Sequence, residues 1–189
     1  MGGAATFKGI GVSGGIAVAP LFCLPEALDR SRQAGTSAEE AEALRRAIEA
    51  AAAALTKLSA GLDEDAAAIL EFQLTLLEDD DILVPVFNAI AEGVPADTAW
   101  QQALDREIAD YAEGGDEVFS ARASDLADLR DRVLAELSGA ASLALPDQPS
   151  ILVARDIAPS RFLEMDSRLI AGIALGEGSR TSHVSLLAR

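Results

Sequence analysis

The sequence is poor in aromatic residues, cysteine and basic residues, and each shortage limits what the protein can be. Aromatic residues make up 4% of the 189 residues and hydrophobic residues 50%, so the core must be built from Ala, Leu, Ile and Val. Because Ala has the highest helix propensity, this composition favours close-packed helices. Cys23 is the only cysteine, which excludes an internal disulfide and indicates a reducing, cytoplasmic location.

Charge and hydropathy exclude further classes of protein. Asp and Glu number 31 against 15 Lys and Arg, for a formal net charge of −16. Nucleic acid and anionic membranes both attract the opposite sign, so we expect neither as a partner and favour a basic protein. No apolar run approaches the roughly 20 residues of a membrane span, and the N-terminus lacks the layout of a signal peptide. We therefore expect a soluble protein.

The pattern of the chain changes from strand-like to helical and back. Aliphatic and small residues alternate near the N-terminus, which predicts strands at residues 7–12 and 16–23. Strand-like segments return at residues 151–154 and 169–173, with a helical turn at 158–160 between them. In the middle of the chain apolar residues recur at helical spacing. They predict helices at residues 37–61, 63–80, 82–92, 95–112 and 116–137.

This order predicts a helical bundle inserted into an α/β domain. Short loops between long helices indicate antiparallel packing, and the strand-like segments on either side must pair in space to form one sheet. We therefore predict an α/β domain from residues 1–30 and 145–189 and an all-α subdomain from residues 36–140. Ser37 followed by Glu40 fits a capping box at the start of the first helix.

The only histidine, His183, follows a glycine-rich loop and opens a short amphipathic segment. An isolated histidine is most often a surface or helix-capping residue. Here, small residues let the backbone approach a ligand, and a helix N-terminus offers free N–H groups to an anion. The positive helix end disfavours the imidazolium and favours an attached phosphate. These features favour a phosphoryl-carrier role for His183.

Five blocks of sequence carry a resemblance to a known family. They are Gly9–Ala17, Leu76–Asp79, Arg122–Asp125, Ile151–Ser160 and Arg180–Arg189. In this order they resemble the N-terminal half of enzyme I of the bacterial phosphotransferase system, the phosphoenolpyruvate–protein phosphotransferase. The last block alone is also similar to the phosphohistidine domains of pyruvate phosphate dikinase and phosphoenolpyruvate synthase. The acidic helical insertion and the opening block favour enzyme I.

The resemblance implies an α/β phosphohistidine (swivelling) domain, truncated, with an inserted all-α helical bundle subdomain. In the family, the histidine that matches His183 takes a phosphoryl group from phosphoenolpyruvate (PEP) and passes it to the carrier protein HPr, which docks on the helical subdomain. A C-terminal barrel binds PEP and Mg²⁺ and mediates dimerisation. The sequence shows no match to that barrel, so we expect this chain to be monomeric, without a metal site and inactive with PEP alone, and the full enzyme to be a homodimer.

The resemblance also assigns phosphate contacts around His183. Two arginines are candidates for neutralising the group in transfer, and hydroxyl or backbone groups of the loop for holding its oxygens. The phosphate-binding candidates are Arg189, Arg180, Thr181, Ser182 and Gly178.

Two residues near His183 depart from the family pattern. Ser179 stands where relatives commonly have the second glycine of a pair. Phe162 stands where relatives often carry a Thr that holds the tautomer of the histidine ring, and a phenyl ring cannot accept that hydrogen bond. Ser185, two residues after His183, we interpret as an ordinary surface residue of the helix.

One long stretch of the helical segment carries acidic residues without any basic ones. Between Lys57 and Arg106 there is no basic residue, while eleven Asp or Glu occur. The run Glu78–Asp81 falls at the predicted end of the second helix, where carboxylates oppose the helix dipole and lower stability slightly. This loss of stability indicates that the run has a function. We predict that this surface docks HPr, with Arg122 at a family interface position. The docking candidates are Glu64, Asp65, Glu71, Leu76, Asp79, Asp80 and Arg122.

Two other functions stay open on the sequence alone. A degenerate relative of enzyme I would bind HPr as an interaction module without transferring phosphate. A phosphohistidine domain of a pyruvate phosphate dikinase-like enzyme would use the same histidine beside a nucleotide-binding domain. The sequence does not distinguish which sugar or nitrogen pathway is served.

Overall fold

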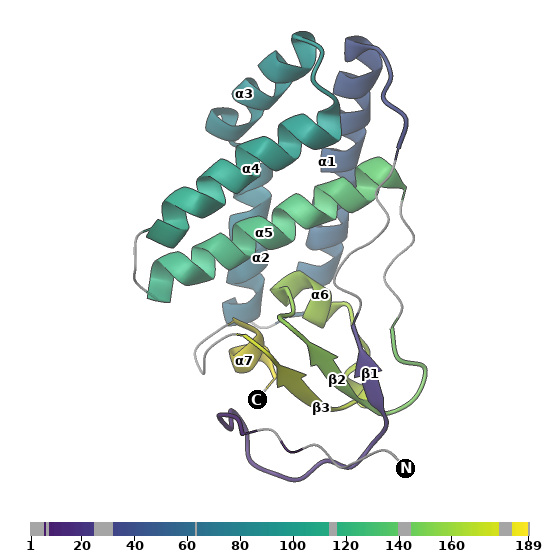
Figure 1. The fold of residues 1–189 in the computed structure, drawn as a ribbon, viewed down its shortest axis with the longest axis vertical. Coiled ribbons are helices and arrows are strands. Elements are labelled where there is room, and N and C mark those ends of the chain that lie inside the picture. The colour runs from purple at the N-terminus through teal and green to yellow at the C-terminus, as the bar shows by residue number, and fades with distance from the viewer. Residues whose placement is uncertain are drawn as a thin grey trace.

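The computed structural model describes residues 6, 8–24, 32–62, 64–113, 117–139, 145–177 and 183–188. Long helices occupy one end of the molecule, and a small sheet with two short helices occupies the other (Figure 1). The long helices are α1 (Ser37–Ser59), α2 (Glu64–Leu77), α3 (Asp80–Ala91), α4 (Ala96–Glu113) and α5 (Glu117–Ser138). The other elements are β1 (Leu21–Cys23), β2 (Ser150–Ala154), α6 (Pro159–Leu163), a 3-10 turn at Ser167–Leu169, β3 (Ile170–Leu175) and α7 (His183–Leu187).

The helices pack around an aliphatic core that is centred on one indole ring. Trp100 of α4 is fully buried, and its Nε1 donates a hydrogen bond to the carbonyl oxygen of Arg130 at 3.2 Å, so the polar edge of the ring is satisfied. Around it lie Leu and Ile side chains from all five long helices, as the composition predicts. Buried core residues include Leu44, Leu55, Leu70, Leu77, Ile90, Leu104, Leu126 and Leu129.

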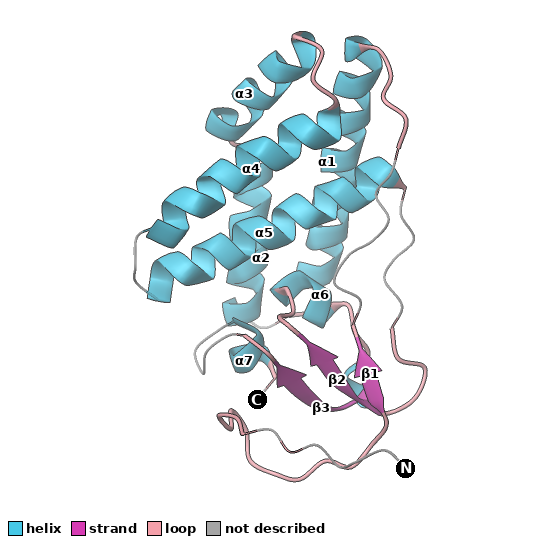
Figure 2. Ribbon diagram, viewed as in Figure 1, coloured by secondary structure: helices cyan, strands magenta, loops and turns pink. Residues whose placement is uncertain are grey.

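Within the described residues the sheet has three parallel strands in the order β1–β2–β3. Phe22 of β1 is in register with Leu152 of β2, and Leu152 with Ile173 of β3. Because β1 precedes the helical bundle in the chain and β2 follows it, the sheet joins two segments that flank the bundle (Figure 2). The predicted fold class, an α/β fold with an inserted helical bundle, is confirmed.

The prediction of strands at residues 7–12 and 16–23 is wrong for most of its length. Residues 8–12 and 16–20 are not in strands, and β1 is limited to Leu21–Cys23. Ile16 and Val18 are 96% and 94% exposed, so no described segment covers them. Their alternation with small residues is a local signal, whereas a strand needs a partner, and interior glycines weaken pairing.

The predicted capping box at the start of α1 is displaced by one residue. Thr36, not Ser37, is the N-cap: its hydroxyl accepts from the Glu39 N–H at 3.4 Å, and Glu39 Oε2 accepts from the Thr36 N–H at 2.8 Å. The sequence Thr-Ser-Ala-Glu-Glu allows both frames. The Thr36–Glu39 frame forms in the structure, because the Glu40 carboxylate binds other groups.

Glu40 is a buried carboxylate that joins α1 to the start of α4. It is 4% exposed, accepts from the Gly35 N–H at 2.8 Å and the Ala96 N–H at 2.7 Å, and pairs with the Arg32 guanidinium. Burial alone would raise the pKa of Glu40. The two backbone N–H groups and Arg32 outweigh burial and hold its pKa below the ordinary value.

Replacing Glu40 by Gln is expected to lower the free energy of unfolding by about 2–3 kcal/mol at pH 7, because the largely buried guanidinium of Arg32 loses its close partner and keeps only Asp97, whose Oδ2 lies 3.6 Å from Arg32 Nε. The folded pKa lies below the unfolded one. The carboxylate therefore contributes stability above its unfolded pKa of about 4.3, and the contribution is lost as pH falls through the folded value. Urea denaturation at pH 7 and pH 3 should show the deficit shrinking at pH 3. An equal deficit at both pH values would contradict this account, and exposed Glu42→Gln serves as the control.

Candidate functional site

His183 is the first residue of α7, which follows the carboxyl end of β3. The backbone pairing of β2 and β3 continues past both strands: the Gly176 N–H donates to the Ala154 oxygen at 3.0 Å, and the Glu177 N–H to the Arg155 oxygen at 2.7 Å. The carboxyl ends of the strands point toward the helical bundle (Figure 2). His183 thus lies at the edge of a parallel sheet where α/β proteins bind ligands.

The short helix α7 is anchored by the residues directly after His183. Val184 is 4% exposed and packs with Leu152, Ile157 and Met165 in the core of the α/β half. Ser185 is 7% exposed, so its interpretation as an ordinary surface residue is wrong. Five residues cannot form a stable helix by themselves, and α7 therefore depends on this burial.

Phe162 of α6 packs against the same apolar cluster as Val184. A Thr at this position would bring a hydroxyl to the cluster, whereas the phenyl ring brings only apolar surface. The structure therefore gives Phe162 a packing role between α6 and the α/β core. The side chain of His183 lies outside the described residues, and so do the phosphate-binding candidates Gly178, Arg180, Thr181, Ser182 and Arg189.

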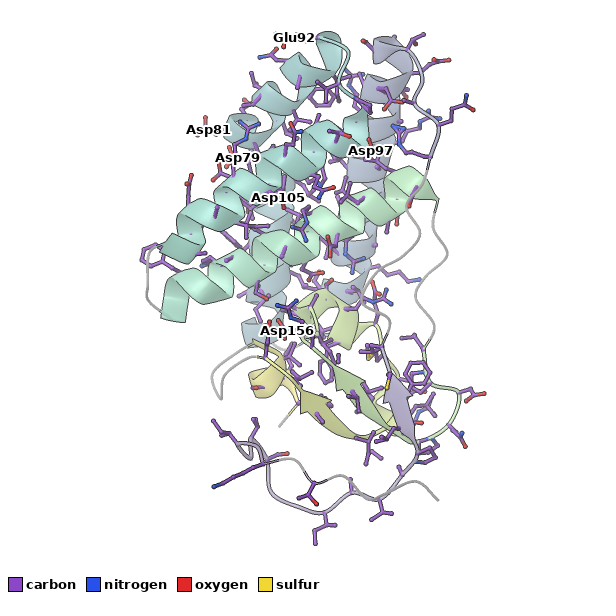
Figure 3. All side chains as sticks on the ribbon, in the orientation of Figure 1. Asp79, Asp81, Glu92, Asp97, Asp105 and Asp156 are labelled. Carbon is purple, nitrogen blue, oxygen red and sulfur yellow. The ribbon has the colours of Figure 1, made fainter. Side chains whose placement is uncertain are left out.

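An exposed ion pair that sequence reasoning missed lies at the same edge of the sheet. Arg155 Nε and Glu177 Oε1 are 2.7 Å apart; Arg155 directly follows β2, and Glu177 is the second residue after β3. Asp156 is also exposed there (Figure 3), and its Oδ1 accepts from the Ile157 N–H at 2.9 Å. Because carboxyl ends of adjacent parallel strands lie side by side, the position of these residues after the two predicted strands was the available signal.

The predicted docking residues lie on α2, α3 and α5. Glu71 and Asp80 are exposed, while Leu76 and Asp79 are half-buried. A hollow of about 440 Å³ lies at the junction of α2 and α3, lined by Leu74, Thr75, Glu78, Asp79 and Asp80. We call Glu71, Glu78, Asp79 and Asp80 the acidic surface; of these, Asp79 is labelled in Figure 3, beside the neighbouring Asp81. Glu64 and Asp65 belong to α2, but their side chains lie outside the described residues.

Three of the four carboxylates in the acidic run do not oppose a helix dipole, contrary to the prediction from sequence. α2 ends at Leu77, and Asp79 is the N-cap of α3, where its Oδ1 accepts from the Asp81 N–H at 2.9 Å. Asp80 and Asp81 occupy the first turn of α3, the end at which negative charge is stabilising. The cost inferred from the sequence therefore falls on Glu78 alone, which directly follows the end of α2, and the run has a structural use as well as its charge.

Two substitutions of Asp79 separate its capping of α3 from its negative charge. Asp79→Ala is expected to lower the free energy of unfolding by about 1 kcal/mol through loss of the cap, whereas Asp79→Asn should change it little because Asn caps equally well. Both remove the charge. Thermal denaturation of the two variants measures this difference, and equal losses in both would contradict the capping role.

Arg122 of α5 lies flat against α2. Its guanidinium carbon is 3.8 Å from the centre of the Phe72 ring, and its Nη1 is 3.9 Å from Asp125 Oδ2. The side chain is 40% exposed, so it is held in place and still open to a partner. The structure thus brings a fixed cation next to α2, which also carries Glu71.

The described residues contain no cluster of metal ligands and no membrane-spanning helix. No group of three or more His, Cys, Asp or Glu side chains among them could hold a metal ion. None of the helices in the described ranges is both long and apolar enough to cross a membrane.

Comparison with known proteins places the chain in a family. Residues 8–122 match the model of the PEP-utilising enzyme, N-terminal region, and residues 146–189 match the PEP-utilising enzyme mobile domain. The chain belongs to the PEP-utilising enzyme family. The N-terminal model covers the sequence from the segment before β1 into α5, and the mobile-domain model covers β2, β3 and the His183 segment.

The relatives of the chain include phosphoenolpyruvate-protein phosphotransferases. The chain is 34% identical to the phosphoenolpyruvate-protein phosphotransferase of Streptomyces coelicolor over 97% of its own length and 34% of that protein. It is 36% identical to the phosphoryl donor subunit DhaM of the PEP-dependent dihydroxyacetone kinase of Escherichia coli, over 90% of its length and 36% of that protein. The chain therefore spans about a third of the length of these curated relatives.

Solved structures agree with this class. The solution structure of Enzyme I (nEIt) matches with a TM-score of 0.72 and 28% identity, over 96% of this chain and 77% of the other. The N-terminal domain of Enzyme 1 - Nitrogen matches with a TM-score of 0.65 and 25% identity, over 94% and 77% of the two chains. The shared fold is that of the N-terminal domain of Enzyme I.

Proposed function

We propose that His183 carries a phosphoryl group between PEP and the histidine of the carrier protein HPr. One observation carries the proposal: the only histidine of the chain opens α7 at the carboxyl edge of a parallel sheet, inside the segment that matches the mobile domain of PEP-utilising enzymes. We further propose that residues 1–30 and 145–189 form the phosphohistidine domain and residues 36–140 the HPr-docking subdomain. PEP would bind in a domain of the whole protein outside these residues.

The reaction is two displacements at phosphorus. The neutral imidazole of His183 attacks the phosphorus of PEP, an N–P bond forms while the ester P–O bond breaks, and enolpyruvate leaves and later takes a proton from water. The carrier's imidazole then attacks the same phosphorus, and the N–P bond to His183 breaks as the new N–P bond forms. Only an unprotonated ring nitrogen has the lone pair that either attack needs.

Charge neutralisation at the phosphoryl group is assigned to the neighbours of His183 in sequence. Arg180 and Arg189 would offset the charge on the oxygens during transfer, and Thr181, Ser182 and the backbone at Gly178 would donate hydrogen bonds to them. Mg²⁺ is assigned to the PEP-binding domain of the whole protein, as the resemblance to enzyme I implies.

The acidic surface supports a basic carrier as the partner. Its carboxylates attract positive charge over a distance of about 10 Å at moderate salt, which would steer HPr to α2 and α3. Leu76 and the apolar wall at Leu74 offer contact area beside these charges. Arg122, held on Phe72, would donate to an acceptor on the carrier.

A second candidate function uses the same histidine with a different acceptor. The similarity to DhaM, a phosphoryl donor subunit, is as high as that to the phosphotransferases. In this alternative the phosphoryl group passes from His183 to a domain of a multidomain donor protein that serves a small-molecule kinase. The chemistry at His183 is unchanged, and only the acceptor distinguishes the two.

The test is reverse labelling. HPr carrying a radioactive phosphoryl group, and freed from the enzyme that made it, is mixed with the protein. We expect transfer of phosphate that is stable in base and labile in acid, the behaviour of a phosphohistidine. Binding of HPr without such transfer would identify an interaction module and refute the proposal. Transfer to a DhaM-type domain but not to HPr would establish the second candidate instead.

A further inference from the structure

A buried polar cluster joins the helical bundle to α6. We call Asp128 of α5, Ser160 of α6 and Gln73 of α2, with Arg132 and Glu164, the interface cluster. Ser160 and Gln73 are fully buried and Asp128 is 6% exposed. None of these residues belongs to the proposed docking surface or to the His183 segment, so the proposed function gives them no role.

Asp128 is the centre of the interface cluster. Its Oδ2 accepts from the Ser160 N–H at 3.1 Å and from Gln73 Nε2 at 3.0 Å, and its Oδ1 accepts from the Ser160 hydroxyl at 2.8 Å. Arg132 Nη2 donates to the Ser160 oxygen at 2.7 Å and to Glu164 Oε1 at 2.6 Å. Three helices are thereby tied together by hydrogen bonds between positions far apart in the sequence.

Burial makes the hydrogen bonds of the interface cluster sensitive to small displacements. It raises the pKa of Asp128, against the hydrogen bonds from Gln73 and Ser160 and the charge of Arg132. A buried polar group that loses a partner pays its full desolvation penalty, so each group in the cluster tolerates little displacement. Apolar packing of the same area would be non-directional and would leave the helices freer to shift.

α6 is the element through which the cluster acts on the site. Leu163 packs against the helical core, and Phe162 against the α/β core that also contains Val184. α6 therefore lies between the two halves and contacts both α5 and α7 (Figure 1). Its five residues are too few to form a stable helix alone, so this packing and the directional hydrogen bonds to Ser160 together hold α6 in place.

We propose that Asp128 and Ser160 are positioning residues that hold α6, and through it α7 and His183, at a set distance and orientation from the helices that dock the carrier. This inference rests on the proposed function. Transfer needs the two imidazoles in line across one phosphorus, and the carrier is held by α2, α3 and α5 while His183 belongs to the other half. A docked carrier can therefore exchange the phosphoryl group with His183 only if the two halves keep a fixed separation and orientation.

The kinetic test separates positioning from stability. A displacement of about 1 Å in a reacting group costs about 100-fold in rate, so we expect Ser160→Ala to slow transfer from phospho-HPr about tenfold and Asp128→Ala about 100-fold. The affinity for HPr should not change in either. Asp128→Asn should restore most of the rate, since the amide can keep hydrogen bonds to Gln73 and Ser160. Glu40→Gln, a buried carboxylate variant remote from α6, is the matched control and should keep the wild-type rate at temperatures where every variant is folded.

A distance measurement gives a second readout that does not depend on transfer. Spin labels at exposed Gln102 of α4 and Ala188 after α7, in a Cys23→Ser background, report the spacing of the two halves by electron double resonance. We expect one narrow distance in the wild type, in Asp128→Asn and in Glu40→Gln, and a broadened or shifted one in Asp128→Ala and Ser160→Ala.

The outcomes distinguish the inference from the proposed function. Wild-type transfer rates and narrow distances in Asp128→Ala and Ser160→Ala would overturn the positioning role and leave the proposed function intact. An equal loss of rate in Glu40→Gln would also overturn it, because general destabilisation would then explain the effect. A wild type that takes no phosphate would overturn the proposed function and, with it, the catalytic part of the inference, whereas the distances would still decide whether the cluster holds the two halves.

Discussion

His183→Ala is expected to abolish phosphorylation of the protein by phospho-HPr, with a loss of at least about 1,000-fold, because the chain has no other imidazole to form the phosphohistidine intermediate. The result is unambiguous in this chain, because His183 is its only histidine and no second phosphohistidine can form. All base-stable, acid-labile phosphate should disappear. The measurement is the amount of label retained after treatment with acid and with base, in the variant and in the wild type.

The variant should remain folded and should still bind the carrier. Val184, not His183, is the described anchor of α7 in the apolar core, so the free energy of unfolding is expected to change little. An unchanged affinity for HPr, measured by calorimetry, would show that docking and transfer use different residues. If the variant retained acid-labile, base-stable phosphate, the assignment of His183 would be wrong.

Charge reversal on the acidic surface is expected to have the second-largest effect. In Glu71→Lys/Asp80→Lys, like charges would face a basic carrier, which costs several kcal/mol, so the Kd for HPr should rise about 100-fold or more. Both residues are exposed, and Asp79, which caps α3, is left in place. The fold should therefore survive. At saturating HPr the rate of transfer should return toward that of the wild type, because only the encounter is impaired.

A matched variant controls for net charge. Glu92→Lys/Glu136→Lys changes the formal charge by the same amount at exposed positions outside the acidic surface; Glu92 lies at the far end of α3 from Asp80 (Figure 3). We expect its Kd to stay near that of the wild type once salt is above about 0.15 M, where distant charges are screened. Equal weakening in both double variants would show that the acidic surface is not the docking site.

The acidic run shows where reading the sequence succeeds and where it fails. The spacing of apolar residues correctly predicts two helices here, because amphipathic periodicity is a local property. It places their boundary a few residues too late, since the break depends on whether Asp79 caps the next helix or extends the previous one. A one-turn error reverses the electrostatic conclusion, from carboxylates that oppose a dipole to carboxylates that complement one.

In the candidate site, too, some features can be predicted from the sequence and others depend on the tertiary fold. The glycine-rich loop, the lone histidine and the following short helix are contiguous, so the sequence indicates a phosphohistidine site without knowledge of the fold. The Arg155–Glu177 ion pair and the burial of Ser185 depend on how β2, β3 and α6 pack. The strands predicted before residue 20 do not form in the described residues because alternation alone does not supply a neighbouring strand.

What the sequence determined by itself is the class of the molecule: an acidic bundle of Ala- and Leu-rich helices between two strand-forming segments, and a histidine at the start of a short helix. These follow from composition and periodicity, which act over a few residues. Only the tertiary structure decided that Asp128, 32 residues from Ser160, would bind it in a buried cluster, and that Glu40 would hold the start of α4, 56 residues away. Such contacts depend on which helix faces lie together, and that choice is made by the packing of the whole core.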